Sequence, residues 1–282
     1  MPETHSILKI SQATKTFGAG VCALHEVDLA VGRGEFVVVL GPSGSGKSTL
    51  LRSIIGLERL TSGQIDVAGT VVGPKTLRAV RRNVGMIFQH FNLVRNLNVT
   101  TNVLCGCLGR MDAVETILSW FYLFKKSRIE AAHRTLDVVG LAEKRWHRAD
   151  VLSGGQQQRV GIARALMQEP QILLADEPVA SLDPVTGRMV MDLLHAISRQ
   201  QGLTVLVNLH QVELARDYAD RIVGLNRGVK VFDDTPENLT PGEMDRIYAT
   251  DTEERASQAV AIAAYSASAK PRLSSQNRVS AT

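Results

Sequence analysis

A glycine-rich segment, Gly41-Pro-Ser-Gly-Ser-Gly-Lys47-Ser48, joins an apolar run to a helical pattern. The run Phe36–Leu40 is wholly apolar, as expected of a strand that is buried on both faces. From Lys47 to Leu57 the apolar residues recur with helical spacing. Glycines allow the backbone to approach a ligand closely and to direct its N–H groups at phosphate oxygens. The segment therefore predicts a phosphate-binding loop in a strand–loop–helix unit.

The residue types of this loop suit a nucleotide triphosphate. The helix that follows adds its positive N-terminal end, and Lys47 would supply a cation for the β- and γ-phosphates. The hydroxyl of Ser48 is suited to ligate Mg²⁺. The motif alone indicates a nucleotide binder, and the expected ATP-binding residues are Gly41, Pro42, Ser43, Gly44, Ser45, Gly46, Lys47, Ser48 and Thr49.

A second nucleotide motif, Gln171-Ile-Leu-Leu-Ala-Asp176-Glu177, has four apolar residues before two carboxylates. The apolar run predicts a buried strand that brings Asp176 to its C-terminal edge, where the carboxylate can hold Mg²⁺. Glu177 is then positioned to orient or polarise an attacking water. Two solvated carboxylates at a strand end would explain this motif equally well if it stood alone, but the phosphate-binding loop makes that interpretation a poor one.

A third motif, Leu152-Ser153-Gly154-Gly155-Gln156, precedes a helical pattern from Gln157 to Met167. Ser153 and the exposed N–H groups at this helix start predict a second anion site. Two phosphate-binding helix ends can act on one ATP only if they converge. At this point the sequence resembles the ABC ATPase family, in which the signature motif of one subunit closes over ATP bound to the other. The resemblance implies a head-to-tail homodimer whose partner ATP is contacted by Ser153, Gly154, Gly155 and Gln156.

The other positions of the family pattern are also filled, and their roles follow from the resemblance. Phe17 matches the aromatic residue that stacks on adenine, although a core phenylalanine at a strand end is the alternative. Gln89 matches the glutamine that senses Mg²⁺ and the γ-phosphate, at the start of the segment that meets the permease. Asp183 matches the loop that crosses the dimer beside Glu177, and His210 matches the histidine that contacts the γ-phosphate. The resemblance thus implies ATP and Mg²⁺ as cofactors, Glu177 and His210 as catalytic residues, and as metal ligands Ser48, Gln89 and Asp176.

Strand and helix patterns alternate at both ends of the chain, around a mostly helical stretch from about Val99 to Ala149. The expected fold is therefore α/β, a mainly parallel core that carries an inserted helical subdomain. The resemblance implies that this core is an ABC-type P-loop NTPase core with a mixed or parallel sheet and antiparallel N-terminal strands. The strands are expected at 7–10, 26–31, 36–40, 64–67, 84–88, 172–175, 203–209, 221–225 and 229–232. We expect the ATPase domain at residues 1–250, with its helical subdomain at about 90–165. The tail 251–282 is rich in Ala and Ser and is expected to be disordered or loosely helical.

Composition excludes several other classes of protein. The three cysteines form no disulfide framework and no complete metal-binding pattern. The net charge of +4 is too small to indicate nucleic acid, and no such partner is expected. The N-terminus lacks the features of a signal peptide, and no run is long enough to span a bilayer. If the protein works at a membrane, another subunit must anchor it there.

Short stretches narrow the resemblance further. Phe91-Asn-Leu-Val, Thr101-Asn-Val-Leu-Cys-Gly and Leu209-His-Gln-Val-Glu-Leu-Ala are similar to phosphonate-importer ATPases. The resemblance implies a subunit at the cytoplasmic face of the inner membrane, with two permease subunits and, indirectly, a phosphonate-binding protein. Importers of polar amino acids share some of these stretches. An importer of those or of another oxyanion stays open, as does an assembly factor for enzymes that cleave carbon–phosphorus bonds.

The segment Ile117–Phe124, followed by Lys125, Lys126 and Arg128, allows two interpretations. We expect a helix that packs on its own core, followed by a solvated basic turn, because amphipathic helices usually face their own core. The alternative is a surface that receives a cytoplasmic helix of the permease.

Overall fold

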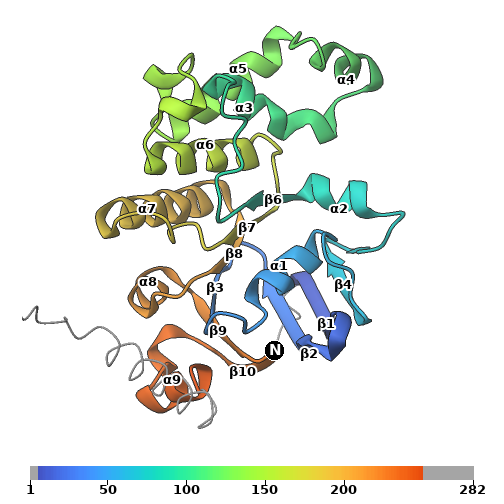
Figure 1. The fold of residues 1–282 in the computed structure, drawn as a ribbon, viewed down its shortest axis with the longest axis vertical. Coiled ribbons are helices and arrows are strands. Elements are labelled where there is room, and N and C mark those ends of the chain that lie inside the picture. The colour runs from blue at the N-terminus through green and yellow to red at the C-terminus, as the bar shows by residue number, and fades with distance from the viewer. Residues whose placement is uncertain (1–5, 250–282) are drawn as a thin grey trace, which may run out of the picture. The chain divides into compact units, whose positions relative to one another are not determined.

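The computed structural model describes residues 6–249, and the described part up to Ile247 forms one compact unit. Its centre is a six-stranded sheet with the strand order β10-β9-β3-β8-β7-β6 (Figure 1). All neighbours in this sheet are parallel except β10, which pairs antiparallel with β9. These strands are β3 (Phe36–Leu40), β6 (Val84–Ile87), β7 (Ile172–Asp176), β8 (Thr204–Asn208), β9 (Arg221–Asn226) and β10 (Val229–Asp234).

A four-stranded antiparallel sheet lies beside this core, with the order β2-β1-β4-β5. Its strands are β1 (Ser6–Thr16), β2 (Cys22–Gly32), β4 (Ser62–Val67) and β5 (Thr70–Val71). A continuous apolar core joins the two sheets through β3 residues such as Val37 and Val39 and through the buried face of α1 (Lys47–Ile54). The predicted α/β architecture, with antiparallel N-terminal strands beside a mainly parallel sheet, is confirmed.

The strands β1 and β2 are each eleven residues long, which exceeds the expected 7–10 and 26–31. Their alternation of apolar and polar residues is interrupted because Gln12 and Glu26 have φ angles of 48° and 47°. The β1–β2 register shifts between Ile10 and Ala13. After a bulge, the buried side chains change from odd-numbered to even-numbered positions or the reverse. A search for strict alternation of apolar and polar residues therefore finds only part of such a strand.

The inserted helices pack on one another at one end of the sheet, where α3 contacts α5 and α6 (Figure 1). The helices of this region are α3 (Val99–Leu104), α4 (Ala113–Ser119), α5 (Lys126–Val138) and α6 (Gly154–Leu166). The remaining helices are α2 (Leu77–Asn83), α7 (Pro184–Gln201), α8 (Val212–Tyr218) and α9 (Pro241–Ile247). That residues 90–165 form a separate subdomain stays a prediction, and the predicted tail lies outside the described residues.

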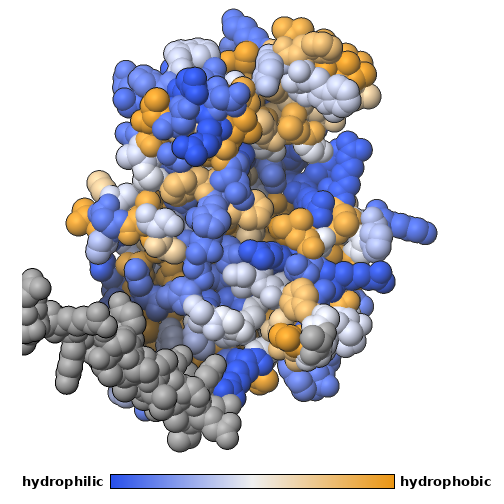
Figure 2. Space-filling model, viewed as in Figure 1, coloured by the Kyte–Doolittle hydropathy of each residue, from blue (hydrophilic) through white to orange (hydrophobic). Residues whose placement is uncertain are grey.

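The expectation that Ile117–Phe124 forms a helix packed on its own core is wrong, because α4 ends at Ser119 and most of the segment is exposed. The basic turn expected after it is wrong in part, since Lys126 and Arg128 belong to α5. Trp120, Phe121, Tyr122 and Leu123 are 77%, 70%, 61% and 59% exposed, respectively. Figure 2 shows apolar surface gathered over this end of the molecule. The cause is the turn that follows α4. In it the N–H groups of Tyr122 and Leu123 donate to the carbonyl oxygens of Ser119 and Leu118, both at 3.0 Å, so the hydrogen bonds of the helix end are made within the turn. Four consecutive large side chains on such a turn cannot all face the core. An apolar stretch of sequence therefore does not predict buried side chains here.

Candidate ATP-binding and catalytic site

The phosphate-binding loop lies between β3 and α1, as expected from the sequence. All five residues of β3 are buried, and α1 starts at Lys47. Gly46 has a φ of 103°, and a Cβ there would lie 2.3 Å from the carbonyl oxygen of Ala23. A Cβ on Gly41 would lie 2.1 Å from the carbonyl oxygen of Leu225. These two positions therefore require glycine, because both neighbouring atoms belong to backbone that cannot move independently.

The side chain of Lys47 is folded back over this loop. It is 4% exposed, and its ammonium donates to the carbonyl oxygens of Gly41 at 2.7 Å and Pro42 at 3.0 Å. Burial lowers the pKa of Lys47, while the nearby carboxylates of Glu177 and Asp176 act in the opposite direction. The fold thus holds a desolvated cation at the start of α1, where phosphate oxygens would satisfy it better than two carbonyl groups do.

The strand β7 brings Asp176 to the loop. Its carboxylate is 2% exposed, and its Oδ1 accepts hydrogen bonds from Ser48 Oγ and Asn208 Nδ2, both at 2.8 Å. The Arg52 guanidinium lies 3.8 Å from Oδ2. A hydroxyl and a carboxylate side by side are the hard oxygen donors that Mg²⁺ prefers. The expected metal ligands Ser48 and Asp176 are therefore adjacent and chemically suited to the ion, whereas Gln89 follows β6 and is exposed.

Glu177 and His210 form a pair at the same edge of the sheet. Glu177 follows β7, and its Oε1 lies 2.5 Å from Nε2 of His210, which follows β8. The backbone of Glu177 has a φ of 50°, a left-handed conformation that costs a non-glycine residue free energy and often marks functional sites. The two expected catalytic residues thus meet in the structure, although their spacing in sequence is large.

The expected adenine-stacking residue is not part of the core. Phe17 follows β1 and is 39% exposed, which contradicts the alternative of a core phenylalanine. The ammonium of Lys15 lies 4.6 Å from the centroid of its ring and bonds to Glu58 at 3.3 Å. Because the cation occupies one face of the ring, the other face can stack against a planar ligand.

The signature residues lie away from this group. Ser153 caps α6 in a capping box, in which its backbone N–H donates to Gln156 Oε1 at 3.1 Å. A Cβ on Gly155 would lie 2.3 Å from Cγ2 of Thr186 in α7, and Asp183 caps α7 by accepting from the N–H of Thr186 at 3.0 Å. Figure 1 shows α6 well separated from α1. One chain therefore gathers the phosphate-loop residues, Asp176, Glu177 and His210, and carries the signature elsewhere.

Two side chains that support this arrangement were not expected from the sequence. Asn208 is fully buried and bonded to Asp176. Arg164 of α6 donates to the carbonyl oxygens of Phe91 and Asn92, at 3.0 Å and 2.5 Å, and so fastens the segment after Gln89 to the signature helix. Burial lowers the pKa of Arg164. Asn208 could have been noticed in the sequence as an amide at the end of an otherwise apolar run. Nothing in the sequence singles out Arg164.

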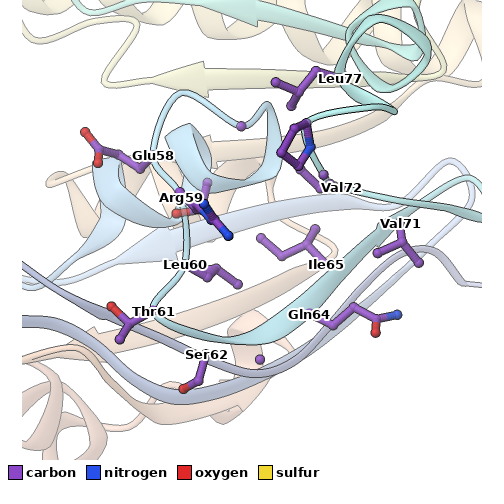
Figure 3. A pocket seen from close by; sticks show the side chains of 15 residues that line it. Glu58, Arg59, Leu60, Thr61, Ser62, Gln64, Ile65, Val71, Val72 and Leu77 are labelled. Atoms are coloured by element: carbon purple, nitrogen blue, oxygen red, sulfur yellow. The ribbon is translucent and has the colours of Figure 1, made fainter.

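A separate pocket of about 430 Å³ lies between the α1–β4 connection and strands β4 and β5. Figure 3 shows its apolar floor, with Leu60 and Ile65, and the side chain of Arg59 beside it. None of the expected site residues lines this pocket. Its volume therefore gives no reason to move the candidate site away from the phosphate-binding loop.

Comparison with known proteins agrees with this geometry. Residues 24–180 match the family model described as ABC transporter. The phosphonates import ATP-binding protein PhnC of Thiobacillus denitrificans is 51% identical over 243 residues, which cover 86% of this chain and 93% of that protein. A second such protein, from Trichodesmium erythraeum, is 51% identical over 234 residues, with 83% and 89% covered.

Solved structures share the fold. The cbiO1 protein of Clostridium perfringens, part of the ABC transporter complex cbiONQ, has a TM-score of 0.74 at 27% identity and covers 86% of this chain and 93% of its own. A dimeric ATP-binding cassette in a post-hydrolysis state, bound to ADP and phosphate, has a TM-score of 0.71 at 34% identity, with 81% and 98% covered. The chain therefore belongs to the ABC transporter family and groups with the phosphonates import ATP-binding proteins.

Proposed function

We propose that this chain is the ATP-hydrolysing subunit of an importer that drives phosphonate uptake across the cytoplasmic membrane. The observation that supports ATP hydrolysis is the convergence of Lys47, Asp176, Glu177 and His210 at one edge of the sheet. The relatives that are 51% identical over most of the chain support phosphonate as the substrate class. Within residues 6–249 no helix has the length and apolarity that a membrane crossing needs. We assign the subunit to the cytoplasmic face of the membrane, held there by a permease.

The mechanism follows from the charges around the loop. The loop N–H groups and Lys47 bind the β- and γ-phosphates, and burial strengthens this attraction because water is excluded. Glu177 orients the attacking water toward the γ-phosphorus, and His210 holds the Glu177 carboxylate by the 2.5 Å contact. Ser48 and Asp176, with Gln89 after β6, are the residues that would hold Mg²⁺. When bound, the ion supplies charge neutralisation on the phosphates.

Dimerisation completes each site in this proposal. The start of α6 at Ser153 presents the positive end of a helix, which suits an anion, yet it lies on a different part of the chain from the phosphate loop. Two copies in head-to-tail orientation would bring Ser153–Gln156 of one onto ATP held by the other, with Asp183 near the crossing. The dimeric cassette with ADP and phosphate supports a nucleotide-bound dimer. ATP binding would close the dimer, and hydrolysis would reopen it.

Phe17 offers a test of adenine stacking. Because base–aromatic stacking contributes about 1–3 kcal/mol per base, Phe17→Ala should weaken ATP affinity by about tenfold. Phe17→Trp should keep the affinity within about twofold, since a larger ring still stacks. The measurement is a titration of each full-length variant with a fluorescent ATP analogue. Equal affinities for Phe17→Ala and the wild type would remove Phe17 from the nucleotide site.

The exposed turn after α4 is our candidate for the permease contact. Ion pairs connect the residues on either side of this turn. Glu115 in α4 pairs with Lys125 at 3.1 Å and with Arg128 at 3.6 Å. The basic side chains nearest the turn thus have acidic partners of their own, which favours an apolar protein surface over anionic lipid. Exposed aromatic clusters of this kind mark interaction sites. We assign this surface, Trp120–Leu123, to a cytoplasmic helix of the permease with an apolar face.

Loss of this surface should uncouple the subunit from its permease. Trp120→Ser combined with Phe121→Ser should abolish co-purification with the permease in detergent, because aromatic anchors contribute about 2 kcal/mol or more each. ATP hydrolysis by the isolated subunit should be unchanged. Trp146, which is 68% exposed elsewhere among the inserted helices, provides the matched control Trp146→Ser. Intact permease binding, or loss of binding to anionic vesicles instead, would contradict this assignment.

Growth tests the substrate class. A strain that lacks this gene should fail on methylphosphonate or aminoethylphosphonate as sole phosphorus source and grow normally on phosphate. The wild-type gene should restore growth, whereas the Glu177→Gln gene should not. Normal growth on each phosphonate, in a strain without a redundant importer, would contradict phosphonate import. Co-purification with soluble enzymes and no permease would indicate an assembly factor instead.

A further inference from the structure

We propose that Asn208 is a positioning residue, which fixes the carboxylate of Asp176 for Mg²⁺ binding. This inference rests on the proposed role of Asp176 as a metal ligand. Asp176 and Asn208 are the last residues of β7 and β8, and they pair in the parallel register of these neighbouring strands. Parallel strands end at the same edge of the sheet, so the two side chains meet at the edge that also carries the phosphate loop.

The contacts of Asp176 separate a fixed oxygen from a less constrained one. Oδ1 accepts from Asn208 Nδ2 and from Ser48 Oγ, both at 2.8 Å, while Oδ2 faces Arg52 across 3.8 Å. Ser48 belongs to the phosphate-binding loop and its helix, which hold the nucleotide in the proposed function. Asn208 ends β8, an interior strand of the sheet that has β3 on one side and β7 on the other. It is thus the one of the two donors that belongs to the rigid sheet rather than to the loop.

The burial of Asn208 points to a function other than packing. The residue is fully buried, and its strand is otherwise composed of Thr204, Val205, Leu206 and Val207. Its Oδ1 has no hydrogen-bond partner among the residues that the structure describes. A leucine would fill this place without leaving a buried acceptor unpaired, so the amide lowers the stability of the core. What the amide provides in return is the hydrogen bond to Asp176.

The test separates metal binding from nucleotide binding. Full-length wild type and Asn208→Leu are titrated with Mg²⁺ in the presence of a fluorescent, non-hydrolysable ATP analogue, and analogue binding is also measured in EDTA. Loss of a group that orients a metal ligand typically weakens metal affinity by about 10–100-fold. We therefore expect about tenfold more Mg²⁺ to be needed for half-maximal binding, with affinity in EDTA unchanged. Thr204→Val, at the other end of β8, is the buried polar control and should leave the Mg²⁺ requirement as in wild type.

Two further comparisons keep the result decisive. If Asn208→Leu does not fold, the pair Asn208→Thr and Asn208→Val differs by a hydroxyl against a methyl, and the valine variant should need more Mg²⁺. Asp176→Asn tests the underlying assignment. An unaltered Mg²⁺ requirement in Asp176→Asn would overturn the metal role of Asp176 and this inference with it. An unaltered requirement in Asn208→Leu beside an impaired Asp176→Asn, or an equal loss of affinity in EDTA, would overturn this inference alone.

Discussion

Glu177→Gln should reduce ATP hydrolysis by at least about a hundredfold while ATP still binds, because a positioned acid–base group contributes about 10²–10⁴-fold to a rate. Glutamine keeps the size of the side chain and can still bond to His210. It lacks the negative charge that orients and polarises the attacking water. With binding intact and hydrolysis slow, the closed dimer should accumulate when ATP is present.

Steady-state phosphate release and size-exclusion chromatography with ATP check both parts of this result. The control is the same variant without nucleotide, which should elute as the wild type does. Hydrolysis by Glu177→Gln within a few-fold of the wild-type rate would show that another group activates the water. The left-handed backbone at Glu177 and its contact with His210 would then need a purely structural explanation.

Lys47→Ala should weaken ATP binding by about a hundredfold or more, since each charge-assisted hydrogen bond to phosphate contributes about 1.5–3 kcal/mol. The positive charge of Lys47 also offsets the negative charges of Asp176 and Glu177, which lie near it. Removal of the ammonium takes away a charge that offsets these two carboxylates, so an anionic ligand should bind less tightly.

Equilibrium binding of a fluorescent ATP analogue measures this effect directly. Lys126→Ala is the matched control, because the Lys126 side chain is 92% exposed in the inserted helical region. It should bind as tightly as wild type does. If Lys47→Ala bound the analogue with wild-type affinity, the phosphates would have to lie elsewhere, and the glycine-rich loop would lose its assigned function.

Local sequence was sufficient to predict the site wherever a single segment determines both the local structure and the residues that act there. The strands β3 and β7 are each buried along their whole length. The glycine-rich loop follows β3, and β7 ends at Asp176, as their motifs predict. The positions of Gly41 and Gly46 are fixed by close backbone contacts, and glycine at such positions is visible in the sequence. The phosphate-binding loop could therefore be predicted from its own local pattern, and the Asp176-Glu177 pair from its pattern together with that loop.

Contacts between distant segments could not be predicted in this way. The bond between Asn208 and Asp176 depends on β7 and β8 being neighbours in register, which no local pattern specifies. Arg164 reaches Phe91 and Asn92 because α6 packs beside the segment after β6. The exposure of Trp120 depends on the direction in which one turn leaves α4. In each of these cases tertiary packing decides the outcome, and residue type alone is compatible with more than one.

Uptake of a radiolabelled phosphonate shows whether ATP hydrolysis by this subunit drives phosphonate import. Cells lacking this gene are supplied with the wild-type gene or with the Glu177→Gln gene, and initial uptake rates are measured before the phosphonate can be metabolised. We expect rapid uptake with the wild-type gene and background uptake with Glu177→Gln, although both proteins should bind ATP. Equal phosphonate uptake in cells with the wild-type gene, the variant gene or no gene at all would contradict ATP-driven phosphonate import by this subunit.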